Sequence, residues 1–194
     1  YRDYQYYHHK FLKGAALSDT PIAESYEDYN NINKVEANAF VGPLISKYAV
    51  ESVGIADGSL FIYGDDTEYT YRITRRFPGY MVKSAVIDHQ DPPMKNNGSL
   101  SPENWWKEYY SNRNRIFLIK KYDKKKFTRV CGLVEMIYKI LGLSLSAAVK
   151  KKYRGYHRIR VKLLLKALID GLKDNRGKTI DPLEYLKAIK MIHK

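Results

Sequence analysis

Cysteine is almost absent from this chain of 194 residues, which carries only Cys131. A single cysteine cannot form an internal disulfide, and this excludes the class of small secreted domains that are held together by disulfides. Cys131 lies in an apolar, helix-like run, a setting more typical of a buried thiol than of a reactive one. The simplest interpretation is a protein of a reducing compartment.

The sequence also lacks a signal peptide at its first residues and an apolar run free of charges. It opens Tyr1-Arg2-Asp3, and no apolar segment of the signal-peptide type follows. The most apolar stretch, residues 127–149, is interrupted by Arg129, Glu135 and Lys139. Because charges are costly inside a bilayer, we expect this stretch to form an amphipathic or buried helix, not a transmembrane one.

Acidic residues are scarce in the second half of the chain. Residues 1–97 carry 10 Lys and Arg against 13 Asp and Glu, a net charge of −3, whereas residues 98–194 carry 24 against 8, a net charge of +16. The densest basic runs are Lys150 to Arg154 and His157 to Arg160. This asymmetry favours an anionic partner, either nucleic acid or the cytoplasmic lipid surface, although lysine-rich helices that are simply soluble fit equally well.

What is present suffices for a core, since 44% of the residues are hydrophobic. Residues 1–34 predict irregular structure with one short strand. After them the pattern predicts strands at 39–41, 60–62 and 80–87, a helix from Pro43 to a stop at Gly54, and a helix from Asp65 or Asp66 to about Arg76.

The second half predicts helices alone. They cover residues 101–122, roughly 127–150 and 157–172, and a last helix opened by the capping box Asp181-Pro182-Leu183-Glu184. The Pro-, Gly- and Asn-rich residues 91–99 predict a loop at the switch from acidic to basic sequence. We therefore divide the chain into a mixed part, residues 1–97, and a basic helical part, residues 98–194.

Three acids stand close together just after the apolar run at 60–62: Asp65, Asp66 and Glu68. If that run is a strand, the acids lie at its carboxyl end, where open α/β sheets place ligand-binding residues. Neighbouring carboxylates shift each other's pKa and can act as a base or as metal ligands. An acidic first turn of a helix without any chemistry is the alternative.

The sequence from Phe61 to Arg72, Phe-Ile-Tyr-Gly-Asp-Asp-Thr-Glu-Tyr-Thr-Tyr-Arg, resembles the signature of bacterial rhamnosyltransferases and galactofuranosyltransferases of glycosyltransferase family 2. Other segments resemble the family in the same order along about residues 38–180. They are Asn38 to Ser46, Pro78-Gly79, His89, Tyr109 to Arg115, and Gly171 to Lys178.

The resemblance implies an α/β fold, α+β within these residues. It would be the acceptor-side part of a GT-A fold followed by a C-terminal helical region, without the N-terminal nucleotide-binding half. It implies transfer of a rhamnose- or galactofuranose-like sugar, with inversion, from a UDP- or dTDP-linked donor to a glycan hydroxyl. Asp66 would be the general base, and Asp65 and Glu68 would hold acceptor hydroxyls or orient Asp66. These residues alone would then be inactive, because no Asp-x-Asp motif occurs in them.

The remaining site residues also follow from the resemblance. His89 would help to bind Mn²⁺ or Mg²⁺, with full coordination requiring the Asp-x-Asp half. Phe40 and Gly42 would line the donor side. Among the aromatic residues, Trp105, Trp106 and Tyr110 are candidates for acceptor binding, because sugar rings stack on aromatic faces. The role of the Arg113-Asn114 pair stays open between structural support and anion binding.

The implied setting is cell-surface polysaccharide synthesis by a cytoplasmic enzyme, in which the basic helices dock peripherally on the inner face of the membrane near a lipid-linked glycan acceptor. The alternative is a basic nucleic-acid-binding module, or a non-catalytic membrane-associated one. No nucleic acid is expected as a partner, because neither an RNP-like, a helix-turn-helix nor a zinc pattern accompanies the basic run.

Overall fold

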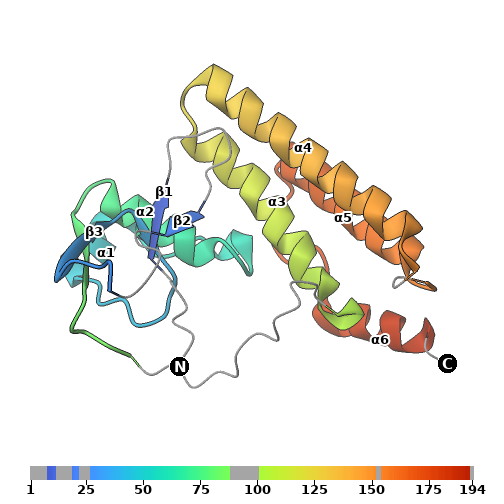
Figure 1. The fold of residues 1–194 in the computed structure, drawn as a ribbon, viewed down its shortest axis with the longest axis horizontal. Coiled ribbons are helices and arrows are strands. Elements are labelled where there is room, and N and C mark those ends of the chain that lie inside the picture. The colour runs from blue at the N-terminus through green and yellow to red at the C-terminus, as the bar shows by residue number, and fades with distance from the viewer. Residues whose placement is uncertain (1–7, 12–18, 22–26, 88–100, 152–153, 193–194) are drawn as a thin grey trace. The chain divides into compact units, whose positions relative to one another are not determined.

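A computed structural model describes residues 8–11, 19–21, 27–87, 101–151 and 154–192, and most of them are helical (Figure 1). The chain forms two compact units. The first comprises Tyr1–Lys13, Leu17–Asp57 and Asp65–Met94, and the second Gly14–Ala16, Gly58–Gly64 and Lys95–Lys194. The fold is thus mixed α/β with a predominance of helix. The predicted boundary between residues 97 and 98 falls outside the described residues.

The first unit contains two small antiparallel sheets. β1 (His8–Phe11) pairs with both β2 (Asp19–Pro21) and β4 (Ala37–Asn38). β3 (Ile32–Val35) pairs with β5 (Gly79–Val82), with Val35 opposite Gly79. The prediction of one short strand within residues 1–34 was therefore too low.

Two helices of the first unit pack on each other. α1 (Lys47–Val53) contributes Ala49 and α2 (Asp65–Thr74) contributes Tyr69 and Ile73 to one apolar cluster. The Thr70 hydroxyl of α2 exchanges hydrogen bonds of 2.9 Å with the main-chain N–H and carbonyl of Asn38. This pair of bonds ties α2 to the end of β4.

Three predicted boundaries in the first unit were wrong. A strand was expected at 39–41, but the strand in this region, β4, lies earlier and ends at Asn38. The helix expected from Pro43 begins at Lys47, because the Ser46 hydroxyl caps it by accepting from the Ala49 N–H at 3.2 Å. The strand expected at 80–87 ends at Val82, which pairs with Ile32, the first residue of β3. The predicted stop at Gly54 is confirmed, with a φ of 78°.

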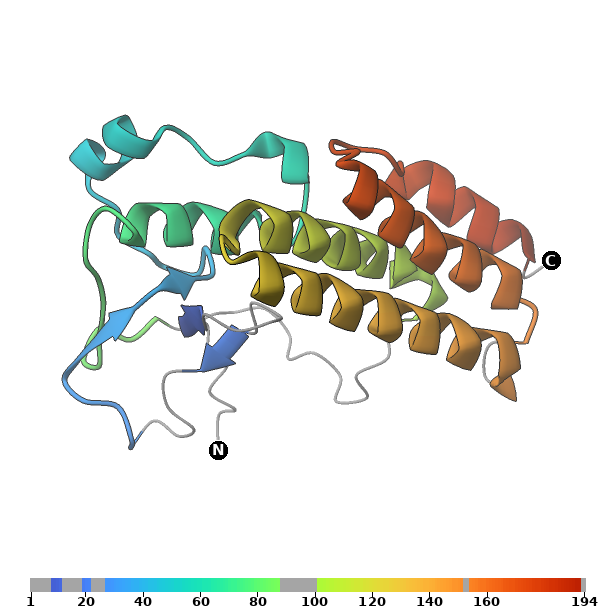
Figure 2. The ribbon, with the colours of Figure 1, turned by 90° about the horizontal axis from the view of Figure 1, so that it is seen from above.

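The second unit is helical, as predicted. A short 3₁₀ turn at Pro102–Asn104 precedes α3 (Trp105–Tyr122), and α4 (Lys126–Val149), α5 (His157–Lys173) and α6 (Pro182–Ile192) follow. α3, α4 and α5 lie side by side (Figures 1 and 2). At the start of α6 the Asp181 carboxylate accepts from the N–H groups of Leu183, 2.8 Å away, and Glu184, which confirms the predicted Asp cap.

Aromatic residues of α3 form much of the core of the second unit. Trp105, Tyr109 and Tyr110 are at most 1% exposed. They pack with apolar residues of the other three helices: Ala147, Leu163, Ala167, Tyr185 and Ile189. A close approach at Gly171 joins α5 to α3, since a Cβ there would lie 2.9 Å from the Cβ of Ile116.

α4 is long and apolar, and only part of its surface is buried. Its 24 residues have a mean hydropathy of 1.5 over the best window, of which only 28% is buried, so by length and composition it could cross a membrane. The sequence predicted an amphipathic or buried helix at this position. The structure buries one face of the helix and leaves the rest partly or fully exposed.

Candidate active site

The three acidic residues lie in the first turn of α2, as predicted. Asp65 is the first residue of the helix and Asp66 the second, and both side chains are partly exposed. Glu68, by contrast, is fully buried, with 0% exposure. Negative charge at this end of a helix is favoured by its unpaired N–H groups and its dipole. The turn therefore presents two accessible carboxylates and one inaccessible one.

The buried carboxylate of Glu68 is paired with Arg72, one helical turn further along α2. Its Oε1 lies 3.1 Å from Nε of Arg72, and Oε2 lies 3.3 Å from Nη2. The same guanidinium donates to the main-chain carbonyls of Val53 and Ile55. Glu68 is thus held inside the first unit, and its burial argues against the predicted role of holding acceptor hydroxyls.

Asp66 has one carboxylate oxygen engaged and one available. Oδ1 accepts from the main-chain N–H of Thr67 at 2.7 Å and from its hydroxyl at 3.3 Å. No partner of Oδ2 is found among the described residues. Burial, and to a smaller degree the charge of Asp66, raise the pKa of the neighbouring Asp65 above its usual 3.8. The charge of Asp66 therefore acts on Asp65.

The chain reaches Asp65 through a 3₁₀ turn at Gly58–Leu60 followed by strained backbone at residues 61–64, together the loop at residues 58–64, and not through the predicted strand. Phe61 and Tyr63 have φ values of 67° and 62°, and Gly64 has a φ of 86°. Left-handed backbone is unfavourable for residues with a side chain and persists only where the surroundings enforce it. The argument that the acids stand at the carboxyl end of a strand was therefore wrong.

Two buried side chains of α3 enforce this loop conformation. The Asn114 amide donates to the carbonyls of Leu60 at 2.9 Å, Ile62 at 2.9 Å and Tyr63 at 2.7 Å. The Arg113 guanidinium donates to the Leu60 carbonyl at 3.0 Å. These carbonyls are satisfied by side chains, and this explains why a strand partner is not needed.

Arg113 also connects the loop to the turn before α6. It donates to the Gly177 carbonyl at 2.7 Å and to the Thr179 hydroxyl at 3.2 Å, and the Gly177 N–H donates to the Ser59 carbonyl at 2.6 Å. Arg113 and Asn114 are each 1% exposed. Of the two roles that the sequence left open for this pair, the described contacts are those of structural support. The adjacent Arg and Asn just before the apolar run Ile116 to Ile119 were the available signal.

The aromatic residues predicted to bind an acceptor differ in exposure. Trp105 and Tyr110 are 1% and 0% exposed, and the Tyr110 hydroxyl bonds both the carbonyl and the N–H of Ile180. Their faces are covered by the core, so in this structure they are not available to stack on a sugar. Trp106 is half-buried and remains a candidate.

The residues predicted to line the donor side lie in the first unit. Phe40 is 46% exposed and meets the Tyr69 ring edge-on, with centroids 6.0 Å apart. Gly42 has a φ of 69°, and a Cβ there would come within 1.8 Å of Cδ1 of Ile87. The backbone conformation favours glycine at position 42, whereas the end of the exposed Ile87 side chain can move aside.

The predicted metal residue, His89, lies outside the described residues. Within the described ranges no three His, Cys, Asp or Glu side chains form a group that could hold a metal ion. Asp65 and Asp66 by themselves do not make a metal site, so no step below is assigned to Mn²⁺ or Mg²⁺, which stay predictions.

No protein-family model, curated protein or solved structure matches this chain. The resemblance to glycosyltransferase family 2 therefore rests on the sequence segments quoted above.

Proposed function

We propose that this chain supplies the acceptor side of an inverting glycosyltransferase of GT-A type, with Asp66 as the general base. The substrates are a nucleotide-diphosphate sugar and a hydroxyl of a glycan acceptor. The observation that carries the proposal is the strained loop at residues 58–64, which leads directly into the paired carboxylates of Asp65 and Asp66. Backbone strain that is enforced by buried hydrogen bonds gathers at functional sites.

The geometry of Asp66 suits proton transfer. Its Oδ1 is fixed by the N–H of Thr67, which leaves Oδ2 to accept the proton of the attacking hydroxyl. As the acceptor oxygen bonds to the anomeric carbon, the bond from that carbon to the diphosphate breaks and the proton passes to Asp66. The hydroxyl becomes more acidic as the new bond forms, so the position of the base matters more than its strength.

Asp65 and Glu68 support Asp66 differently in this proposal. Asp65 is partly exposed and can hold an acceptor hydroxyl beside the base. Glu68 is a positioning residue, because its pairing with Arg72 fixes the first turn of α2 from inside the unit. Arg113 and Asn114 fix the loop before that turn.

The test is a transfer assay in which the chain is supplied with a donor-binding half, in one polypeptide or as a second chain. Asp66→Asn is expected to lower turnover by at least about 100-fold, the usual contribution of a general base, while nucleotide-sugar binding is unchanged. The control is Asp174→Asn, an exposed aspartate in the left-handed conformation that asparagine also accepts. Full turnover by Asp66→Asn would refute the assignment of the base.

A further inference from the structure

An apolar stripe runs along the solvent side of α4. Its members recur every three or four residues, the spacing that places side chains on one face of a helix. They are Phe127, Val130, Val134, Tyr138, Leu141, Leu145 and Val149, and each is between 42% and 79% exposed. We call these seven residues the α4 stripe.

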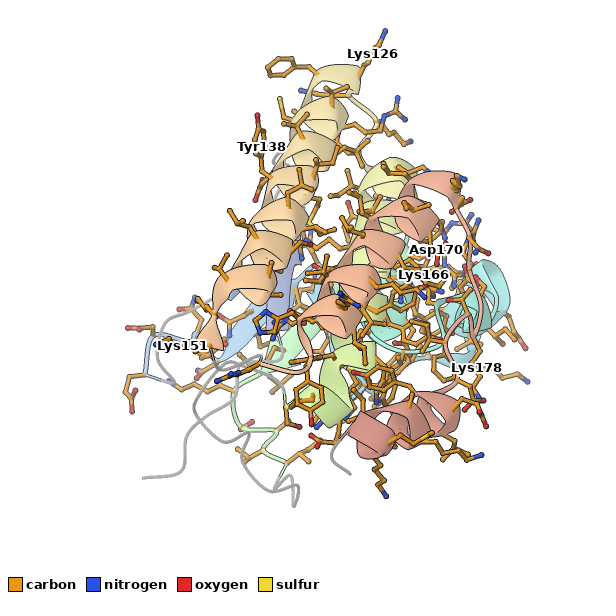
Figure 3. All side chains as sticks on the ribbon, turned by 90° about the vertical axis from the view of Figure 1, so that its right-hand side faces the viewer. Lys126, Tyr138, Lys151, Lys166, Asp170 and Lys178 are labelled. Atoms are coloured by element: carbon orange, nitrogen blue, oxygen red, sulfur yellow. The ribbon has the colours of Figure 1, made fainter. Side chains whose placement is uncertain are left out.

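The α4 stripe is separate from the face by which α4 packs in its own unit. That packed face consists of Gly132, Met136, Ile140, Ser144 and Ala147, all buried. In Figure 3, Tyr138 projects from α4 on the side away from α5. The helix thus has two apolar faces, and the fold of the unit uses only one.

Positive charge lies at both ends of the α4 stripe. Lys124, Lys125 and Lys126 precede it, and Lys150 and Lys151 follow it, all exposed. Figure 3 shows Lys126 and Lys151 at opposite ends of the helix. Beyond the second cluster come Arg154 and Arg158, which are also exposed. An apolar strip between cationic ends suits a surface that is both apolar and anionic.

A groove on α5, next to the C-terminal end of α4, repeats this chemistry. It has a volume of about 700 Å³ and combines apolar with cationic side chains, together with the carboxylate of Asp170. Its other lining residues are Ala148, His157, Arg158, Val161, Lys162, Leu165, Lys166 and Ile169.

Charge decides between a lipid surface and a second copy of the chain as the occupant. Two copies joined along the α4 stripe would bring together two halves that each carry a net charge of +16. An anionic leaflet neutralises that charge instead, and each basic residue close to such a surface contributes favourably. Charge complementarity therefore favours the lipid surface.

The packing of α4 favours a helix that lies on the membrane over one that spans it. Its length of about 36 Å would suffice to cross the hydrocarbon core. Its buried face, however, is packed against α3 and α5, and α5 carries Arg158, Lys162 and Lys166. Spanning would carry these cations into the bilayer, where they are costly.

We propose that α4 lies in the plane of an anionic membrane, with the α4 stripe inserted among the acyl chains and the lysines at both ends on the headgroups. This inference does not rest on glycosyl transfer. A failure of the Asp66→Asn test would leave it standing, and its own failure would leave the general base standing.

The test uses the whole chain and phosphatidylcholine vesicles with and without phosphatidylglycerol. Co-sedimentation is expected only with the anionic vesicles. Val134→Gln, Leu141→Gln and Leu145→Gln combined are expected to weaken binding by about tenfold or more, since apolar insertion supplies much of the affinity. The matched control replaces three exposed apolar residues elsewhere, Leu44, Ile55 and Leu183, by Gln and is expected to bind as the parent does.

A second readout reports insertion directly. In a Cys131→Ser background, Tyr138→Cys is labelled with an environment-sensitive fluorophore. Its emission is expected to shift to the blue on anionic vesicles and to be quenched by spin-labelled acyl chains. Binding that high salt abolishes without any blue shift, equal binding by both triple variants, or a preference for RNA over vesicles would each overturn the proposal.

Discussion

The side-chain amide of Asn114 donates a hydrogen bond of 2.7 Å to the main-chain carbonyl of Tyr63, a residue with a φ of 62°. The same amide bonds the carbonyls of Leu60 and Ile62. A conformation that is unfavourable for a tyrosine is thus fixed by one buried side chain of α3. Hydrogen bonds from α3 therefore hold the loop in place within the second unit.

Asn114→Ala is expected to destabilise the protein by about 2–4 kcal/mol, because the carbonyls of Ile62 and Tyr63 lose the donor that Asn114 supplies, whereas the Leu60 carbonyl keeps Arg113. Equilibrium unfolding in urea measures the change. Asn112→Ala is the matched control: Asn112 is also on α3 and 4% exposed, but its amide makes one bond, to the Glu108 carbonyl within the helix. A cost of Asn114→Ala no greater than that of the control would contradict the role given to Asn114.

Arg72→Met is expected to cost about 3–5 kcal/mol, the range for removing one partner of a buried ion pair. The change leaves the Glu68 carboxylate, which is 0% exposed, without its guanidinium, and also removes a donor from the carbonyl of Ile55. Unfolding of the first unit, followed by hydrogen exchange of α2, is the measurement.

Arg75→Met serves as the control for Arg72, since Arg75 is exposed just beyond the end of α2 and contacts the Tyr71 side chain. It is expected to change stability by less than about 0.5 kcal/mol. If the two variants proved equally stable, the pairing of Glu68 with Arg72 would not matter to the fold.

Two glycines within helices are expected to respond to alanine with opposite signs. Gly171→Ala places a Cβ 2.9 Å from Cβ of Ile116 and 3.0 Å from the Arg113 carbonyl, which is backbone and cannot turn away. Overpacking at this crossing of α3 and α5 should cost about 1–3 kcal/mol. Gly142→Ala on α4 meets nothing within 4 Å and should stabilise by up to about 1 kcal/mol. Thermal unfolding of both variants tests the contrast, and equal signs would contradict it.

The stability of the second unit is expected to fall above pH 10. Burial and the hydrogen bond to Asp170, 2.6 Å away, raise the pKa of Tyr109 from 10.0 to about 12. Between these two values the folded protein keeps a proton that the unfolded chain has lost. The contribution of Tyr109 to stability is therefore fully present below pH 10, the pKa in the unfolded chain, and is lost as pH rises through about 12, the pKa in the folded protein.

Tyr109→Phe checks this pH dependence. The variant loses the bonds to Asp170 and Thr179 and is expected to be less stable at neutral pH, but the difference from the parent should narrow as pH rises above 10. Urea unfolding at a series of pH values measures it, with the exposed Tyr138→Phe as control. A constant difference across that range would show that Tyr109 is not the titrating group.

Two helices of the second unit, α3 and α6, were predictable because they carry boundary signals in their own sequence. Ser101-Pro102 marks the 3₁₀ turn before α3, and the Asp181 carboxylate caps α6 with no help from distant residues. The start of the helix at Asp65 was also predictable from its own residues, since acidic residues favour a helix N-terminus. In these places the nearest neighbours in sequence supply the hydrogen bonds.

The conformation of residues 60–63 was not predictable, because partners more than fifty positions away decide it. The apolar run from Leu60 to Ile62 favours a strand locally, but Asn114 and Arg113 take up the carbonyls and hold a left-handed turn. Whether an aromatic side chain of α3 is buried also depends on residues far away in the sequence. Nothing close in the sequence separates the buried Trp105 from the half-buried Trp106.

The sequence by itself determined the helices of the second unit, the Asp181 cap of α6, the acidic turn at Asp65 and Asp66, and the basic second half. All of these depend on residues within a turn or two, or on composition. Only the tertiary structure decided that Glu68 is buried against Arg72, that a buried Arg-Asn pair fixes the loop before Asp65, and that α4 packs one apolar face and leaves the other exposed. Helical spacing reveals that a face is apolar, but only the packed neighbours determine whether that face is covered.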